Sequence, residues 1–270
     1  MLMTDTDWLE LWRELSITTV RKMGKGTTKR YEDHAITKKK ERPDPLLDFI
    51  KENTDSQDTV LDIGSGNGRW IIPLAEIAKS ATAVEPADSM EELLHRNISD
   101  TGVDNITVIP ARWEYALIEP HDIVTCAHAM YGNPYLADLV GWMERHAGKM
   151  CCLAMRLPPH NSIIAELSRA IHGHSHDSPN AIIAYNALYS LGIYANVIVE
   201  DGIKPWTNDS FDEALEQAKR HLRVESTTAH DELIGDTLAR RLTHVNDSYI
   251  WPDDGMRSAL LWWKPRAVSK

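Results

Sequence analysis

The sequence is poor in cysteine and has no long apolar run. Its three cysteines among 270 residues are too few for the disulfide framework of a small secreted protein. It has no stretch of about 18 apolar residues that could form a transmembrane helix. Residues 1–7 are acidic and do not have the layout of a secretory signal peptide. These absences together predict a cytoplasmic protein.

Basic residues are fewer than acidic ones: the 29 lysines and arginines and the 40 aspartates and glutamates give a net charge of −11. Such a charge disfavours nonspecific binding to nucleic acid. The exception is segment 21–42, which holds nine basic and three acidic residues. We interpret it either as a solvated arm or as a basic lip that admits an anionic substrate or contacts a nucleic acid or an acidic partner. The chain length and the hydrophobic content of 43% predict a folded, enzyme-sized domain.

The most informative segment is a glycine-rich turn within residues 60–70, VLDIGSGNGRW. It predicts a buried strand, a sharp turn and the start of a helix, and its three glycines let the backbone approach a ligand closely. The glycine spacing is not the G-x-G-x-x-G of dinucleotide-binding proteins. No G-K-[ST] follows, which argues against a nucleoside triphosphate site. The turn therefore indicates another kind of ligand.

A second buried strand is predicted at 81–84 and ends in Glu85. An acidic residue about 20 positions beyond a glycine turn can accept hydrogen bonds from two ribose hydroxyls. The alternative is a solvated residue at a strand end. A third strand at 106–109 is followed by Trp113. This residue either anchors the core or, as the resemblance described below implies, covers a ring of the ligand. Strands at 122–126 and 150–155, alternating with helical segments, predict parallel βαβ units with a ligand at the carboxyl ends of the strands.

The glycine turn and the sequence Ala83-Val84-Glu85-Pro86 resemble motifs of class I S-adenosylmethionine (SAM) dependent methyltransferases. The resemblance covers about residues 45–160. It implies an α/β, Rossmann-like sheet, mostly parallel with an antiparallel edge strand, and SAM as the cofactor. The chain is most similar to a prokaryotic subgroup with an N-terminal tryptophan helix and a terminal W-W, which indicates no substrate. By this resemblance, the expected cofactor-binding residues are Asp62, Gly64, Ser65, Gly66, Asn67, Gly68, Glu85, Pro86, Met90, Arg112, Trp113, Glu114 and Cys126.

The rest of the chain is predicted to surround this sheet. Residues 1–43 are expected to form a helical N-terminal cap or lid, because apolar residues recur at helical spacing within 8–15. Residues 44–270 are expected to form the SAM-binding domain, with a helical insertion at about 203–250. Beyond residue 160, helices are predicted at 162–170, 181–191, 211–222 and 231–245, and strands at 195–200 and 258–263.

Two residues just beyond the fourth predicted strand are candidates for catalysis. His128 has a pKa range suited to removing a proton from an acceptor, and Tyr131 could orient that acceptor. The alternatives are a histidine satisfied within its loop and a tyrosine that only packs. Expected substrate-binding residues are these two with Tyr31 and Arg156. The Arg156 guanidinium could pair with a carboxylate or phosphate of the acceptor, or form a surface ion pair.

Two short motifs are interpreted structurally. Gly132-Asn133-Pro134-Tyr135 is similar to the N-P-P-Y motif of amino-methylating nucleic-acid enzymes, but it has one proline and lies later after the strand. We interpret Asn133 as a helix cap with Pro134 at the first helical position. The alternate histidines of segment 172–177, HGHSHD, could bind a transition metal, but a polar loop is the commoner outcome and no metal site is predicted.

The sequence therefore predicts a SAM-dependent methyltransferase that acts by direct displacement, with alignment of acceptor and methyl group supplying most of the rate enhancement. A small molecule is the favoured acceptor, because no recognised RNA-binding module is appended. Its pocket is expected between the SAM site and the N-terminal lid. The alternatives are an RNA or protein methyltransferase that docks through segment 21–42 and a non-catalytic SAM-binding protein.

Overall fold

The computed structural model describes residues 6–19, 44–176, 178–200, 205–255 and 257–266. The chain divides into two compact units. The first comprises Met1–Met155, Ala181–Glu200 and Ala259–Lys270, and the second comprises Arg156–Asn180 and Asp201–Ser258. The chain therefore passes from one unit to the other four times. The predicted insertion at about 203–250 falls within the later segment of the second unit.

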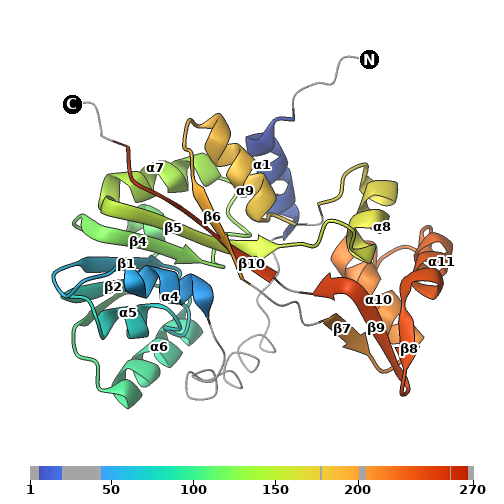
Figure 1. Ribbon diagram of the computed structural model, residues 1–270, viewed down its shortest axis with the longest axis horizontal. Coiled ribbons are helices and arrows are strands. Elements are labelled where there is room, and N and C mark those ends of the chain that lie inside the picture. Colours follow the sequence, from blue (N-terminus) through green and yellow to red (C-terminus); the bar gives the residue numbers. More distant parts are fainter. Residues whose placement is uncertain (1–5, 20–43, 177, 201–204, 256, 267–270) are drawn as a thin grey trace. The chain divides into compact units, whose positions relative to one another are not determined.

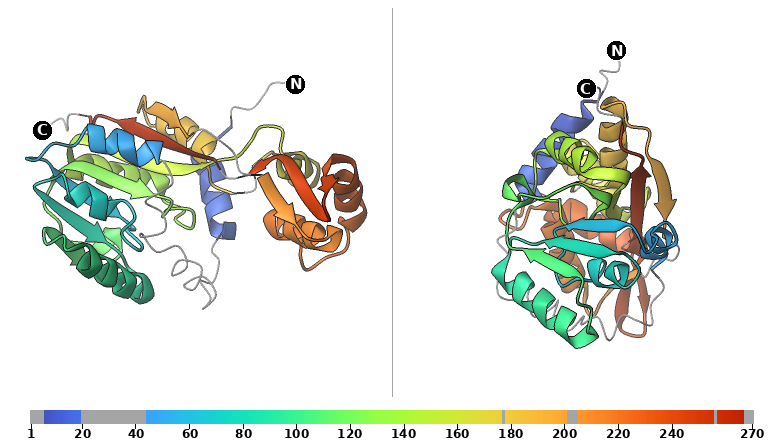
Figure 2. Two further views of the ribbon diagram at one scale, coloured as in Figure 1. Left: turned by 60° about the horizontal axis from the view of Figure 1, so that its bottom comes forward. Right: turned by 90° about the vertical axis from the view of Figure 1, so that its left-hand side faces the viewer.

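The first unit is built around a seven-stranded sheet. Figure 1 shows α4, α5 and α6 on one side of this unit and α1, α7 and α9 on the other, and Figure 2 shows the same elements from two further directions. The elements that contribute to it are α1 (Trp8–Thr19), α4 (Pro45–Glu52), β1 (Thr59–Ile63), α5 (Ile71–Ala75), β2 (Ser80–Val84), α6 (Asp88–Thr101), β3 (Ile106–Ile109), the 3-10 turn η1 (Trp113–Tyr115), β4 (His121–Ala127), α7 (Leu136–His146), β5 (Ala147–Leu157), α9 (Ala181–Ser190), β6 (Asn196–Val199) and β10 (Arg257–Trp263).

The strand order of this sheet is β3-β2-β1-β4-β5-β10-β6. The β1 strand pairs in parallel with both β2 and β4, which makes the gap between β1 and β4 the topological switch point. The β2–β3 and β4–β5 pairs are also parallel, whereas β10 runs antiparallel to β6. The predicted Rossmann-like mixed sheet is therefore confirmed. In such sheets ligands bind at the switch point, outside the carboxyl ends of the strands.

The central strand is apolar because helices cover both of its faces. Val60, Leu61 and Ile63 of β1 are each at most 2% exposed, and they form a nearly continuous apolar run. The main core joins Val60 to apolar side chains of α4, α5 and β2. This packing fixes the end of β1, and with it the position of the glycine turn that follows.

The N-terminal helix α1 packs against α9 and α7. Its Trp12 is fully buried, and the indole Nε1 donates to the carbonyl oxygen of Asn133 at 2.8 Å. The rest of the predicted cap, including the basic segment 21–42, lies outside the described residues. The prediction that Asn133 caps α7 is wrong. The helix begins at Leu136, and Asn133 Oδ1 instead accepts from the backbone N–H of Tyr135 at 2.9 Å, because its short side chain closes a local turn.

The second unit has a core of its own, in which Trp251 is fully buried among side chains of α8 and the later helices. It contains a three-stranded antiparallel sheet of order β7-β9-β8, which the sequence analysis did not predict. Its elements are α8 (Ile163–His172), β7 (Pro205–Asn208), α10 (Phe211–Leu222), α11 (Asp231–Arg241), β8 (Thr243–Val245) and β9 (Ser248–Gly255). The predicted helix at 231–245 is therefore wrong beyond Arg241, where the chain enters a β-hairpin.

Candidate active site

The glycine turn after β1 is held in a conformation that favours glycine. Gly64, Gly66 and Gly68 have φ angles of 70°, 55° and 87°, in the left-handed region. The Gly64 N–H donates to the carbonyl of Val84 at 2.7 Å, which ties the turn to the end of β2. A Cβ on Gly64 would lie 2.4 Å from Cβ of Ala129, whereas one on Gly66 would meet no heavy atom of the described residues within 4 Å. The turn is thus closed by the loop after β4 at one point and open at Gly66.

Glu85, at the end of β2, faces this turn. Its Oε2 accepts from the backbone N–H of Gly66 at 2.8 Å, and its Oε1 accepts from that of Ala87 at 2.9 Å. The residue is 6% exposed, and burial raises the pKa of its carboxyl group, although the two backbone donors oppose the shift. Each carboxylate oxygen retains a further acceptor position. The carboxylate is therefore oriented and can still accept hydrogen bonds from a ligand.

Asp62 lies within β1, behind the turn. Its carboxyl group is 2% exposed, and Oδ1 accepts from the Thr125 hydroxyl of the neighbouring strand at 2.7 Å. Burial raises the pKa of Asp62 to about 7; the bond from Thr125 opposes this rise, and the nearby charge of Glu85 adds to it. Near neutral pH this carboxyl group is therefore present in both protonation states.

The loop after β4 brings the predicted catalytic pair together. His128 has a φ of 56°, an uncommon conformation for a residue with a side chain, and its N–H donates to the carbonyl of Ala154 at 2.9 Å. Its Nδ1 lies 2.8 Å from the hydroxyl oxygen of Tyr131, which is 7% exposed. Ala129, which lies between these two residues in the sequence, occupies the space that a side chain at position 64 would need. The His128–Tyr131 pair thus lies in the loop that contacts the glycine turn.

The segment after β3 carries the remaining aromatic candidate. The ring of Trp113 meets that of Trp142 edge to face, with centroids 5.9 Å apart. Next to it, the exposed Arg112 and the half-buried Glu114 form an ion pair of 2.7 Å. Trp113 is half-buried, so it has a packing partner in α7 and also keeps some accessible surface.

Comparison with known proteins decides the family of this sheet. Residues 60–147 match the family model described as a methyltransferase domain. The chain contains a class I SAM-dependent methyltransferase domain. The predicted methyltransferase family, enzyme class and cofactor agree with this match, which covers residues 60–147 of the chain.

Relatives of known name cover different parts of the chain. It is 40% identical over 67 residues to the mitochondrial ribosomal RNA small subunit methyltransferase of Arabidopsis thaliana, a match that spans 24% of this chain and 18% of that relative. The structure is similar to the YcgJ protein of Bacillus subtilis, with a TM-score of 0.54, 18% identity, and coverage of 81% of this chain and 97% of the other. It is also similar to a SAM-dependent methyltransferase from Thiobacillus denitrificans in complex with S-adenosylhomocysteine (TM-score 0.52, 16% identity, coverage 86% and 98%). At these identities the structural likeness shows the fold.

The other predicted residues are placed unevenly in and around the methyltransferase domain. Ser65 is buried and its hydroxyl donates to the carbonyl of Asp62 at 2.9 Å, while Pro86 is exposed beside Glu85. Met90 is buried in the first turn of α6, and Cys126 is fully buried in β4. Arg156 belongs to the second unit, whereas the other described candidates belong to the first. Tyr31 lies outside the described residues.

Sequence reasoning missed one residue that holds the turn. Asn97 of α6 is 8% exposed, and its Nδ2 donates to the carbonyl of Asn67 at 2.8 Å. It follows Leu93 and Leu94 at helical spacing on the buried face of the helix. A polar residue in an apolar stripe is a signal for such a bond, because a buried amide needs a partner.

Neither a metal centre nor a membrane span is found in the described parts of the chain. No group of three or more histidine, cysteine or acidic side chains there could hold a metal ion. The rings of His172, His174 and His176 stack on one another at centroid distances of 6.2 and 6.4 Å. None of the helices in these same ranges is long and apolar enough to cross a bilayer.

Proposed function

We propose that this chain is a methyltransferase that transfers the methyl group of SAM to a small-molecule acceptor. The observation that carries the cofactor part of the proposal is the carboxylate of Glu85, oriented by two backbone N–H groups and facing the glycine turn. The small-molecule part rests on the absence of a recognised RNA-binding module from the sequence. This arrangement fits a ribose, whose two hydroxyls need adjacent acceptors. The open space at Gly66 fits a ligand that lies against the backbone.

The residues of the turn would hold the cofactor, and those of the loop after β4 would face the acceptor. Bound SAM supplies an electrophilic methyl group on a sulfonium sulfur. Trp113, next to the carboxyl end of β3, is assigned to the face of the adenine ring. Gly64 has no side chain, and this allows Ala129 to approach and holds the loop that carries His128 and Tyr131 beside the turn.

His128 is assigned as the base that accepts a proton from the acceptor. Its hydrogen bond with the buried hydroxyl of Tyr131 fixes the orientation of the imidazole ring. A base of this kind is needed only where the acceptor loses a proton near neutral pH, and the pKa of histidine suits that range. Tyr131 is then a positioning residue that acts through the histidine.

An RNA acceptor is the second candidate, because the chain is similar to a ribosomal RNA methyltransferase over 67 residues. The basic segment 21–42 would supply contacts with phosphates. The two candidates are separated by incubating the protein with radiolabelled SAM and a cell extract, and then fractionating the products into RNA, protein and small molecules. Label in a small molecule other than SAM and its breakdown products supports the first candidate. Label confined to RNA, with binding that weakens steeply as salt rises, supports the second.

The cofactor site is tested by calorimetric titration with S-adenosylhomocysteine. Glu85→Ala is expected to lower the affinity by about 5- to 150-fold, because charged hydrogen bonds contribute about 1–3 kcal/mol. Glu92→Ala is the matched control, since Glu92 is an exposed carboxylate on the neighbouring helix α6. The affinity of this variant for S-adenosylhomocysteine should equal that of the wild type. A folded Glu85→Ala protein with unchanged affinity would remove Glu85 from the site.

A further inference from the structure

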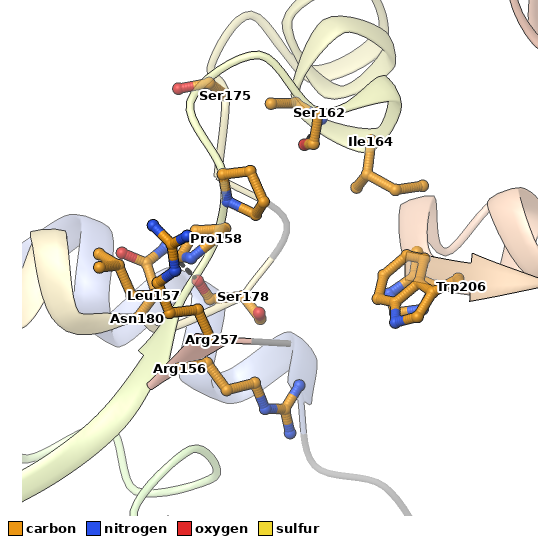
Figure 3. A pocket seen from close by; sticks show the side chains of 13 residues that line it. Arg156, Leu157, Pro158, Ser162, Ile164, Ser175, Ser178, Asn180, Trp206 and Arg257 are labelled. Carbon is orange, nitrogen blue, oxygen red and sulfur yellow. Dashed lines mark hydrogen bonds between the residues drawn. The ribbon is translucent and has the colours of Figure 1, made fainter. Parts of the chain in front are cut away.

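Two surfaces of the molecule are not used by the proposed methyl transfer. One lines a pocket in the second unit, which has about 580 Å³ of empty space. Arg156, Trp206 and Arg257 are among its lining residues, and Figure 3 shows the two arginine side chains pointing to different sides. They do not converge on one anion, so this pocket favours no particular ligand. The other surface belongs to the first unit, and it is apolar and uncharged.

This second surface begins at an edge of the seven-stranded sheet. Strand β6 pairs antiparallel with β10, and no other strand of the described residues pairs with it. Figure 2 shows β6 at this edge, next to β10. Edge strands are usually protected by lysines, prolines or bulges. Asn196–Val199 contains no lysine or proline, and its pairing with β10 has no change of register. The outer N–H and C=O groups of β6 can therefore pair with a further strand.

Two valines of β6 carry exposed apolar surface on one face of the sheet. Ile198 packs against the main core, which includes side chains of α4 and α5. Successive residues of a strand point to opposite faces, so Val197 and Val199 lie on the face where Figure 1 shows α9. Their exposed fractions are 48% and 40%. This face of the edge strand is thus apolar and only half covered.

Helix α9 continues the apolar surface. Its sequence, AIIAYNALYS, has no charged residue. Ala184 and Leu188 are buried, whereas Tyr185 and Tyr189 are 37% and 60% exposed. Tyr189 meets Tyr194, which precedes β6 and is 76% exposed, with ring centroids 5.7 Å apart. A helix that is apolar all round is typical of one that is covered on both sides. We name the exposed set the α9–β6 strip: Tyr185, Tyr189, Tyr194, Val197 and Val199.

The absence of charge indicates which partner suits the α9–β6 strip. The chain as a whole has a net charge of −11, so two copies repel each other in most orientations. At a two-fold contact, each group lies near its own counterpart or that of a neighbour, and like charges there would repel. No residue of the strip is charged. The strip is therefore a surface at which a second copy can approach without such repulsion.

The exposed area is sufficient for a modest contact between two copies. A fully accessible tyrosine contributes about 150–250 Å², so the exposed fractions of the strip amount to roughly 500 Å² on each copy. Two copies would together bury about 1,000 Å², which is the lower limit for a specific interface. Hydrogen bonds between paired β6 strands would add to this contact. We expect a dissociation constant in the micromolar range.

We propose that the α9–β6 strip is a contact between two copies of this chain, whose β6 strands pair antiparallel around a two-fold axis. The pairing joins the two seven-stranded sheets into one continuous sheet. An axis that relates antiparallel neighbouring strands is perpendicular to the sheet, so it brings the two α9 helices together on the same face. Because β5 and β10 separate β6 from β4, the proposed cofactor site beside β1 lies outside the contact. The proposal does not rest on methyl transfer.

Sedimentation velocity of the full chain tests this contact. Over protein concentrations from low micromolar to submillimolar, we expect the wild type to change reversibly from monomer to dimer. Val197→Lys places like charges beside the two-fold axis and should weaken dimerisation at least tenfold. Leu117→Lys is the matched control, because Leu117 is 97% exposed in the segment after η1, outside the strip. A wild type that stays monomeric throughout, or equal dimerisation of the two variants, overturns the proposal.

Further variants separate a lost contact from a lost fold. Tyr189→Lys places the charge on α9 rather than in the sheet, and it should also weaken dimerisation at least tenfold. An equimolar mixture of Val197→Lys and Val197→Glu should regain dimerisation, since opposite charges then lie beside the axis. Misfolded chains would not regain it. If the mixture stays monomeric and Tyr189→Lys dimerises like the wild type, the proposal fails.

Hydrogen exchange locates the contact within the sheet. Amide protection in Asn196–Val199 should increase with protein concentration, because pairing covers the outer N–H groups of β6. Strand β3, at the other edge of the sheet, is the internal control, and its exchange should not depend on concentration. A dimer in which β6 exchanges independently of concentration overturns the strand pairing. If the wild type dimerises in this way but does not bind S-adenosylhomocysteine, the proposed function fails and the dimer stands.

Discussion

Replacing Gly64 by alanine tests whether the glycine turn and the loop after β4 depend on each other. The added Cβ would lie 2.4 Å from Cβ of Ala129, well inside van der Waals contact. Neither atom is the end of a flexible side chain, so relief requires the backbone of the turn or of the loop to move. The loop carries His128 and Tyr131, and the change therefore reaches the proposed catalytic pair without altering it directly.

The expected loss of stability has two parts. An alanine in the left-handed region costs about 1–2 kcal/mol relative to glycine. Forcing an extra carbon into a packed contact costs about 1–3 kcal/mol more. Gly102→Ala isolates the first part, because Gly102 has a φ of 72° at the end of α6 and its added Cβ would meet no described atom within 4 Å. Gly64→Ala should therefore destabilise the protein by about 1–3 kcal/mol more than Gly102→Ala does.

Urea unfolding followed by circular dichroism measures this difference. Gly66→Ala provides a second comparison, because its Cβ would enter the open space of the turn. It should cost about as much stability as Gly102→Ala but weaken binding of S-adenosylhomocysteine. If Gly64→Ala and Gly102→Ala lose the same free energy of unfolding, then the contact with Ala129 does not constrain the loop, and the reasoning is refuted.

Two further changes probe buried polar groups. Burial in the folded protein raises the pKa of Asp62 from 3.8 to about 7. Between these pH values the folded protein keeps a proton on Asp62 that the unfolded chain releases. The free energy of unfolding therefore falls as the pH rises from about 4 to about 7. Asp62→Asn should reduce that fall by about 2 kcal/mol between about pH 5 and pH 7 in urea unfolding, and parallel slopes would contradict the assignment. Trp12→Phe should lower stability by about 1–3 kcal/mol, because it leaves the buried carbonyl of Asn133 without its indole donor. Thermal melts compare this variant with Ile17→Ala, a change at an exposed position of the same helix. Equal melting temperatures of the two variants would contradict the prediction.

The sheet was predictable because its signals are local and agree with one another. The apolar run of β1, the glycine turn and the acidic end of β2 each specify a neighbour in the same βαβ unit. The sequence could bring together those site residues whose proximity follows from the order of strands along the chain. Glu85, which faces Gly66, is an example. Which atoms contact was not predictable, since the approach of Ala129 to Gly64 depends on the register of β1 against β4.

The second unit was predicted poorly for physical reasons. Its strands β7 and β8 are short, and β8 is exposed along its length, so no alternation of buried and exposed residues marks β8. One signal was present: Asn246 and Asp247, with φ angles of 47° and 61°, form the two-residue turn that joins β8 to β9. Asparagine and aspartate tolerate this conformation and often occupy such hairpins. The pocket left no sequence signal, because Arg156, Trp206 and Arg257 are brought together only by the tertiary fold.

The strand order has a consequence for how the molecule is made. Because β10 lies between β5 and β6, the seven-stranded sheet cannot be completed until residues 257–263 have been synthesised. Until then β5 lacks its neighbour on that side and β6 has no partner strand, while the intervening segment of the second unit is being added. Contacts of such long sequence separation slow folding, and unpaired strand edges invite aggregation. We therefore expect nascent chains that end before residue 257 to depend on chaperones, and the assembly of β10 to be the slow step of refolding.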